Sequence, residues 1–247
     1  MRNFKLTLEY DGTAFNGWQV QSQGECTIQG ELTQSLFQVF KQKVTVIASG
    51  RTDAGVHALG QVVHFKVKTR MAPYEIQKAL TSFLPSDIVV VAAEEVDLDF
   101  HAQYSVKSKT YRYTILNRSY ASALERNRCH FYPYSLNVSR MRREAKALIG
   151  KKDCKSFEAA DRDRKKHTTV RTIKKVTVRK KGDWITIDIQ ADGFLYKMVR
   201  NIVGTLLEVG NGRLPLGSIK RILAQKDRCQ AGQTAQPQGL CLVEVRY

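Results

Sequence analysis

Apolar and polar positions along the first hundred residues alternate between a period of two and a helical period, which predicts strands mixed with helices. Residues 4–10 alternate as a half-buried strand does. Apolar side chains recur at helical spacing between Thr27, which can cap a helix, and about residue 43. The other elements expected here are strands over 44–48 and 61–68, a helix opening at Pro73, and an apolar strand over 88–93 buried on both faces.

The second part of the chain repeats this alternation. Residues 172–179 and 184–190 predict a hairpin that closes at Lys181–Gly182–Asp183. The segment 193–209 is apolar almost all round, which predicts a long and largely buried helix. The other elements expected here are a strand over 110–116, a helix that Ser139 caps and that runs to about residue 149, a helix over 216–224, and a closing strand over 240–247.

These elements predict an α+β fold made of two similar α/β halves, each with a mainly antiparallel sheet and helices on one face. The first half spans residues 1–104 and the second spans 105–247; because no Pro/Gly/Ser linker separates them, we expect the two sheets to be joined. No apolar run approaches the roughly 20 residues of a membrane helix, and the first residues lack the apolar core of a secretory signal. We therefore expect a cytoplasmic protein without a membrane partner.

Charge is distributed unevenly along the chain. The net charge is +17, but residues 1–104 hold 9 basic and 11 acidic residues, whereas 105–247 hold 31 and 12. The excess peaks over 140–181, with 17 basic and 5 acidic residues. A concentrated excess of this size indicates a polyanionic partner. The alternatives are a basic surface of the ribosomal-protein type and a solvated loop.

The sequence offers no sign of metal, disulfide or nucleotide chemistry. The five cysteines are odd in number and none are spaced as C-x-x-C, and the histidines show no metal-ligand spacing. Neither of the glycine-rich phosphate-binding motifs occurs. We expect any chemistry to be carried by side chains alone, without a metal or an organic cofactor.

One loop, Ser49–Ala58, concentrates reactive side chains. It contains two glycines within six residues, which indicates an unusual backbone path. Arg51, Thr52, Asp53 and His57 lie along that path between two expected strands, a position where functional sites are often built. The alternative is a surface turn whose aspartate caps its own backbone.

The motif G-R-T-D-A-G-V-H-A at 50–58 resembles the catalytic motif of the TruA family of tRNA pseudouridine synthases. Further motifs follow in the family's order along the whole chain. They are Y-D-G-T-A-F-N-G-W-Q at 10–19, K-T-Y-R-Y at 109–113, V-R-T-I at 170–173, G-F-L-Y-K-M-V-R-N at 193–201 and G-L-C-L at 239–242.

The resemblance implies isomerisation of uridine to pseudouridine at positions 38, 39 and 40 of the tRNA anticodon stem-loop, without a cofactor. It implies Asp53 as the catalytic carboxylate, a catalytic cleft between the halves, and a homodimer that holds tRNA. An ionised carboxylate in a partly dry pocket needs a fixed cation, and Arg200, expected within the buried helix, needs a partner. We predict that Arg200 pairs with Asp53; the alternative is an arginine that reaches solvent.

The remaining candidate residues concern the base and the RNA backbone. Tyr111 is the expected aromatic platform for the flipped uracil, although it can also be a core tyrosine. Arg51 can fill the vacated space or bind a phosphate, and His57 can orient the loop. The expected phosphate contacts are Lys107, Lys109, Arg112, Arg171 and Lys174, together with the basic stretch 140–181.

Two departures from the family pattern motivate alternatives. Gln103 stands where members commonly carry arginine, and the segment 153–157 replaces the usual neighbours of its serine and phenylalanine. A first alternative is therefore a pseudouridine synthase that acts on another tRNA position or another structured RNA. A second is an RNA-binding module without catalysis, which would not need an acid in a cationic groove.

Overall fold

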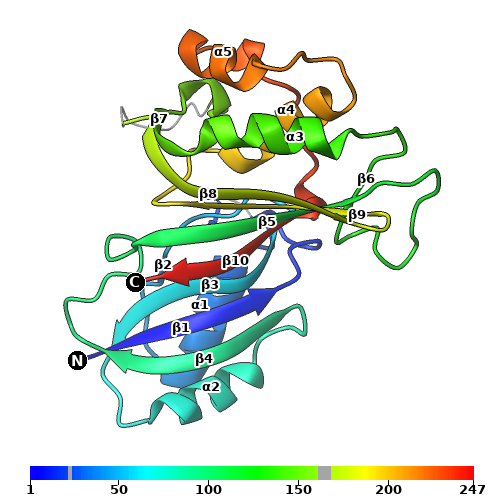
Figure 1. The fold of residues 1–247 in the computed structure, drawn as a ribbon. Coiled ribbons are helices and arrows are strands. Elements are labelled where there is room, and N and C mark those ends of the chain that lie inside the picture. Colours follow the sequence, from blue (N-terminus) through cyan, green and yellow to red (C-terminus); the bar gives the residue numbers. More distant parts are fainter. Residues whose placement is uncertain (22–23, 161–167) are drawn as a thin grey trace. The chain divides into compact units, whose positions relative to one another are not determined.

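The computed structural model describes residues 1–21, 24–160 and 168–247. Residues 161–167 of the predicted basic stretch lie outside the described residues. The chain forms two compact units, a first of residues 1–107 with 241–247 and a second of residues 108–240 (Figure 1). No helix within the described ranges combines the length and the apolar character needed to cross a membrane.

The closing strand belongs with the first unit, whereas the linear division placed it in the C-terminal half. Strand β10 (Leu240–Arg246) pairs in parallel with β3 (His57–Val67), with Cys241 opposite His57. The position of a strand in the sequence does not fix its neighbour, because pairing partners are chosen in three dimensions. The end of the chain is therefore built into the sheet that carries the 49–58 loop.

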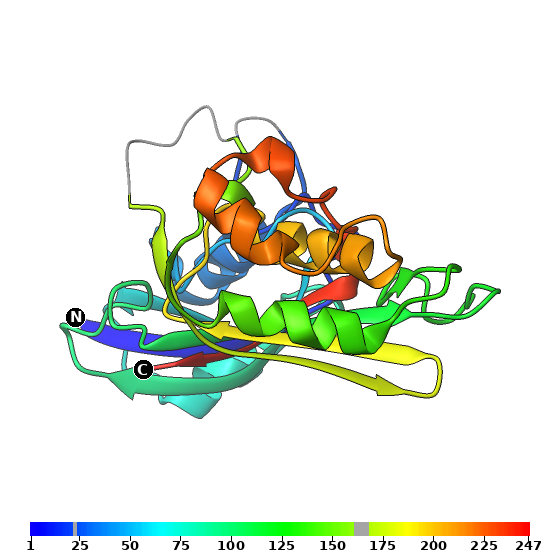
Figure 2. The ribbon, with the colours of Figure 1, turned by 45° about the horizontal axis from the view of Figure 1, so that its top comes forward.

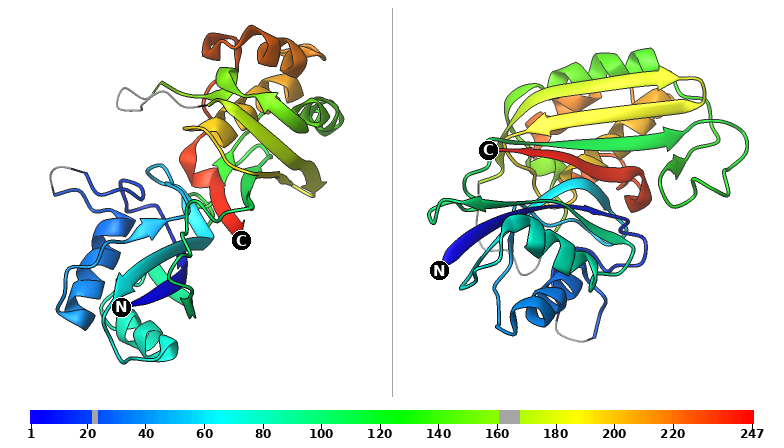
Figure 3. Two further views of the ribbon diagram at one scale, coloured as in Figure 1. Left: turned by 90° about the vertical axis from the view of Figure 1, so that its left-hand side faces the viewer. Right: turned by 90° about the horizontal axis from the view of Figure 1, so that it is seen from below.

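The sheet of the first unit is built around β1 (Arg2–Tyr10). This strand is antiparallel to β3 on one side and to β4 (Ile88–Val96) on the other, and the short β2 (Ile47–Ala48) pairs with β3. Alternate residues of β1 are fully buried, as the pattern predicted. Helices α1 (Ile28–Phe40) and α2 (Pro73–Thr81) lie on the same face of this sheet (Figure 3), and the side chain of Thr27 caps α1 as predicted.

The prediction that residues 88–93 are buried on both faces was wrong. Val89 and Val91 are 47% and 49% exposed, whereas Ile88 and Val90 are buried. Among the described residues, strand β4 stands at the end of the strand order, next to β1. Its side chains alternate between a face packed on the core and an open face. An apolar run with one open face looks the same in sequence as one in a doubly covered strand.

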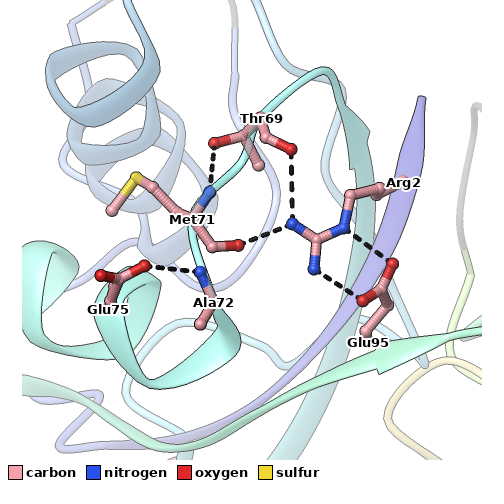
Figure 4. Close-up of polar contacts among 6 residues, drawn as sticks. All are labelled: Arg2, Thr69, Met71, Ala72, Glu75 and Glu95. Carbon is pink, nitrogen blue, oxygen red and sulfur yellow. Dashed lines mark hydrogen bonds and ion pairs between the residues drawn. The ribbon is translucent and has the colours of Figure 1, made fainter.

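Arg2 ties β1 to β4 and to the turn that precedes α2 (Figure 4). Its Nε and Nη2 donate to the two carboxylate oxygens of Glu95 at 2.8 and 2.6 Å, and Nη1 donates to the carbonyl of Met71 at 2.7 Å. At the start of α2, the Glu75 carboxylate accepts the amide of Ala72 at 2.6 Å. This last bond satisfies one of the amides that a helix start leaves without an intrahelical partner.

The second unit repeats the design of a sheet covered by helices on one face (Figure 2). Its antiparallel strands follow the order β5-β9-β8-β7, and β6 pairs in parallel with β5. The predicted hairpin is confirmed, with Gly182 at φ +56 in its turn. The strands are β5 (Ser108–Leu116), β6 (His130–Phe131), β7 (Gly150–Asp153), β8 (Val170–Lys181) and β9 (Trp184–Ala191). The helices are α3 (Val138–Ala145), α4 (Met198–Gly210), α5 (Ser218–Gln225) and the short 3-10 turns Lys146–Leu148, Lys155–Phe157, Arg228–Gln230 and Pro237–Gly239.

Two helix starts differ from the prediction. Helix α3 is capped by Asn137, whose side chain accepts the amide of Arg140 at 3.0 Å, and not by Ser139. Helix α4 begins at Met198 and not at Gly193. Lys197 adopts a left-handed conformation with φ 54, so the right-handed helix cannot extend through it toward the N-terminus. Residues 193–197 therefore form a loop, and Arg200 lies in the first turn of α4 and not in its middle.

Candidate active site

The 49–58 loop leaves the end of β2 and enters β3. Hydrogen bonds to β3 fix its first residues. Ser49 donates its amide to the carbonyl of Val62 at 2.7 Å and its hydroxyl to Gln61 Oε1 at 2.7 Å. The same glutamine donates Nε2 to the carbonyl of Gly50 at 2.9 Å. Ser49 and Gln61 are both fully buried, so the root of the loop is held by a dry polar network.

The segment 10–18 holds the upper part of the loop. The hydroxyls of Tyr10 and Thr52 lie 2.8 Å apart, and the carbonyl of Thr52 accepts the amide of Trp18 at 3.0 Å. Burial raises the pKa of Tyr10, so this hydroxyl keeps its proton. The carbonyl of Phe15 also accepts the amide of Gly55, at 3.4 Å. The residues on either side of position 53 are therefore positioned by another part of the chain.

Two glycines allow this close approach. A Cβ at Gly12 would lie 2.1 Å from the carbonyl oxygen of Val56, and one at Gly17 would lie 2.8 Å from that of Thr52. Gly17 also has φ +86, which other residues rarely adopt. The motif at 10–19 thus works as a cradle for the 49–58 loop. The sequence shows the motif, but only the structure shows what it contacts.

Asp53 stands at the bend of this loop. Its main-chain carbonyl accepts the amide of Val56 at 3.1 Å, so a main-chain hydrogen bond closes this turn. His57 is buried, and its Nδ1 accepts the amide of Gly12 at 3.0 Å with the Asp11 carboxylate 3.2 Å away. These contacts support the expectation that His57 orients the loop.

In the second unit, Tyr111 is buried on the helix-covered face of the sheet. Its ring meets that of Phe194 edge to face, with centroids 5.1 Å apart. Lys109 lies on the same face two residues earlier. Burial, together with the charge of Arg171, lowers the pKa of Lys109 to about 8. A lysine and an arginine therefore share a partly dry environment near the predicted platform.

The predicted phosphate contacts of the second unit do not all lie on one face of its sheet. Arg112 lies on the opposite, helix-free face of the second unit's sheet, where its Nε donates to Asp188 at 2.7 Å. Lys174 is exposed at the irregularity in β8 between Ile173 and Lys175. Lys107 is exposed within the first unit. Alternation along a strand separates neighbours onto two faces, so a run of basic residues in the sequence need not make one surface.

Arg200 is held by the segment that follows α5. Its Nε donates to the carbonyl of Ala235 at 2.8 Å, and the amide of Ala235 donates back to the carbonyl of Arg200 at 3.1 Å. The neighbouring Asn201 is fully buried, and its Oδ1 accepts from Arg228 at 3.0 Å and from Thr234 at 2.7 Å. The sequence analysis did not predict a role for Asn201, Arg228 or Thr234. Of the three, only Asn201 lies in a family motif, at 193–201.

Gly204 on α4 allows the segment 228–235 to pack closely against this helix. A Cβ at Gly204 would lie 1.6 Å from the carbonyl of Gln233, so only glycine fits there without displacing backbone. The first turn of α4 and the 228–235 segment thus form one rigid block around Arg200. Within the described part of the chain, no group of three or more His, Cys, Asp or Glu side chains is arranged to hold a metal ion.

Comparison with known proteins first gives the class of enzyme. The family model described as "tRNA pseudouridine synthase" matches residues 7–105 and 145–247, one segment in each part of the chain. The chain belongs to this family, whose members are isomerases that act on uridine in RNA.

Curated relatives then place the chain in the TruA branch of that family. It is 45% identical over 247 residues to "tRNA pseudouridine synthase A" of Thermoanaerobacter sp. (strain X514), covering 100% of both chains. It is equally similar, at 45% and full coverage of both chains, to "tRNA pseudouridine synthase A 2" of Clostridium perfringens (strain 13 / Type A). A relative from Anaplasma marginale (strain Florida), also "tRNA pseudouridine synthase A", is 43% identical and is covered over 99% of its length.

Proposed function

We propose that this chain converts uridine to pseudouridine at positions 38, 39 and 40 of the tRNA anticodon stem-loop, with Asp53 as the catalytic carboxylate. The assignment of Asp53 is supported by the way the segment 10–18 holds the 49–58 loop. Residues on both sides of position 53 are fixed by hydrogen bonds from segment 10–18, and the turn itself is closed by main-chain atoms. Such a preorganised loop is what a reacting side chain requires.

The reaction exchanges one bond for another within the same nucleotide. The C1′–N1 bond breaks, the uracil turns, and a C1′–C5 bond forms while C5 loses a proton and N1 gains one. No oxidant, reductant or second substrate is consumed. A carboxylate can assist by attacking C1′, by attacking C6 of the ring, or by removing a proton from the sugar. All three routes require the same group, Asp53, in its ionised form.

The other proposed site residues support this carboxylate and the flipped base. We propose that Arg200 pairs with Asp53 and keeps it ionised in the bound complex, that Tyr111 forms the platform for the uracil, and that Arg51 fills the space the base leaves. The block around Arg200 supports the first role, because an arginine with a fixed Nε presents its remaining donors in a defined direction. The contact between Tyr111 and Phe194 fixes the ring plane in the same way.

The charge of the second unit supports a tRNA substrate. Lys107, Lys109, Arg112, Arg171 and Lys174 are proposed to contact phosphates, Lys109 and Arg171 from one face of the sheet and Arg112 from the other. We further propose that the protein is a homodimer whose two basic clefts together hold tRNA, and that it works in the cytoplasm, where tRNA is found.

The target positions can be tested by mapping pseudouridine in tRNA from a strain that lacks this protein. We expect pseudouridine to disappear from positions 38, 39 and 40 and to return when the wild-type gene is restored. If these positions stay modified while pseudouridine is lost elsewhere in tRNA or in another RNA, the alternative target is correct. Restoration of a gene encoding Asp53→Asn serves as the matched control.

The pH dependence of tRNA binding tests the role of Lys109. Because its pKa is about 8 in the folded protein and not the usual 10.5, Lys109 is about half charged at pH 8. Its charge is nearly complete about one pH unit below that value and is lost as the pH rises above it. A bound phosphate favours the charged form of Lys109, so in the tRNA complex this charge should be lost at or above pH 8. We expect tRNA affinity, measured by filter binding at constant ionic strength, to fall between pH 7 and 9.5 and the salt slope to drop by about one.

The matched variant for this test is Lys109→Gln. It should bind tRNA more weakly than the wild type at pH 7 and should show no step in affinity at higher pH. If the wild type and Lys109→Gln show the same pH profile, Lys109 does not contact a phosphate.

A further inference from the structure

We propose that a projecting arm, residues 117–134 of the second unit, is an additional RNA-contacting surface. Its ligand is taken from the proposed function, since tRNA is the polyanion that this enzyme must hold. The arm leaves the end of β5 and extends beyond the tip of the β8–β9 hairpin (Figures 1 and 2). It lies outside the two segments, 7–105 and 145–247, that the family model matches.

Hydrogen bonds anchor both ends of the arm to the second unit. Asn117 donates Nδ2 to the carbonyls of Tyr132 and Tyr134 at 2.9 and 2.8 Å, and its amide donates to the carbonyl of Asp183 in the hairpin turn at 2.7 Å. His130 Nδ1 lies 2.8 Å from the buried hydroxyl of Tyr113. A segment fixed in this way loses little entropy when it binds a partner.

Large side chains on this arm face solvent. Leu124, Tyr120 and Tyr134 are 92%, 64% and 67% exposed. The guanidinium of Arg118 lies over the ring of Tyr120, 4.1 Å from its centroid. An exposed tyrosine with an arginine over one face of its ring can offer the other face for stacking, which is how unpaired RNA bases are held without sequence preference.

The charge of the arm favours RNA over a second copy of the chain. The arm and the adjacent hairpin tip carry five basic residues against Glu125 and Asp183; the five are Arg118, Arg126, Arg128, Lys180 and Lys181. Arg126, Arg128 and both lysines are exposed. Two copies joined through this surface would bring like charges together, whereas phosphates complement it.

Filter binding of an unmodified tRNA transcript at several KCl concentrations tests the proposal. We expect Tyr120→Ala/Tyr134→Ala to raise Kd by about tenfold and Arg126→Ala/Arg128→Ala to lower the salt slope by about two. The matched controls are Tyr74→Ala and Lys43→Ala, which change exposed residues of the first unit and should leave Kd and the salt slope near the wild-type values. Thermal unfolding shows whether each variant is folded, and the arginine variant keeps the test decisive if the tyrosine variant is not.

Unchanged Kd and salt slope in both arm variants would overturn the proposal. So would a change of molecular mass in light scattering without a change in tRNA affinity, because the arm would then be an interface between copies. Failure of the proposed function is recognised separately: a wild type that makes no pseudouridine in any tRNA would refute that function, while the binding comparison would still decide whether the arm contacts RNA.

Discussion

We expect the Asp53→Asn variant to lose pseudouridine formation by about 10⁴-fold or more while it still binds tRNA, as is typical when the central reacting group of an enzyme is removed. Asparagine keeps the size and hydrogen-bonding shape of the side chain but cannot attack C1′ or C6 and cannot accept a proton from the sugar. The loop should keep its path, because main-chain atoms and Thr52 close and anchor it. Release of tritium from C5 of labelled uracil in tRNA measures the loss.

The control for this variant is Asp99→Asn, which changes an exposed carboxylate of the same unit. It should release tritium at the wild-type rate. Filter binding should give Asp53→Asn a Kd within a few-fold of the wild type. Tritium release by Asp53→Asn at a rate close to the wild type would remove Asp53 from the mechanism, and loss of release together with loss of tRNA binding would point to a disordered loop.

We expect Arg200→Ala to lower kcat by about 10²- to 10³-fold, the usual effect of removing a fixed charge from a water-poor site. Without the guanidinium, the Asp53 carboxylate would lose its proposed counter-ion, and burial in a water-poor site would disfavour its ionised form. The acid limb of the pH–rate profile should therefore move to higher pH. A purely structural role for Arg200 would lower the activity without moving that limb.

Arg200→Lys separates charge from geometry. Lysine keeps the positive charge but cannot reproduce the planar donor set that includes the bond to the Ala235 carbonyl, so we expect a partial rescue of kcat relative to alanine. Arg221→Ala, which changes an exposed arginine of α5, is the matched control and should be close to wild type. If Arg200→Ala keeps wild-type kcat and an unshifted pH profile, Arg200 is not the counter-ion of Asp53.

Local patterns were sufficient for most of the secondary structure. Alternation predicted β1 and the β8–β9 hairpin, and Thr27 as a cap predicted α1, because these features depend on neighbours within a few residues. The start of α4 was wrong for a related reason. The apolar residues at 194–196 extend the helical pattern toward the N-terminus, but Lys197 takes a left-handed conformation. No local sequence pattern indicates where this break falls.

By itself, the sequence determined the family and therefore the class of reaction, through the resemblance of the motif around Asp53 and of the further motifs along the chain. It also determined that the basic residues concentrate in the second part of the chain. Only the tertiary structure decided that segment 10–18 cradles the 49–58 loop, that segment 228–235 fixes Arg200, and that β10 returns to the first unit. The physical reason is separation along the chain: a motif records which residues are present, whereas a hydrogen bond between distant segments forms only after both have folded against the same core.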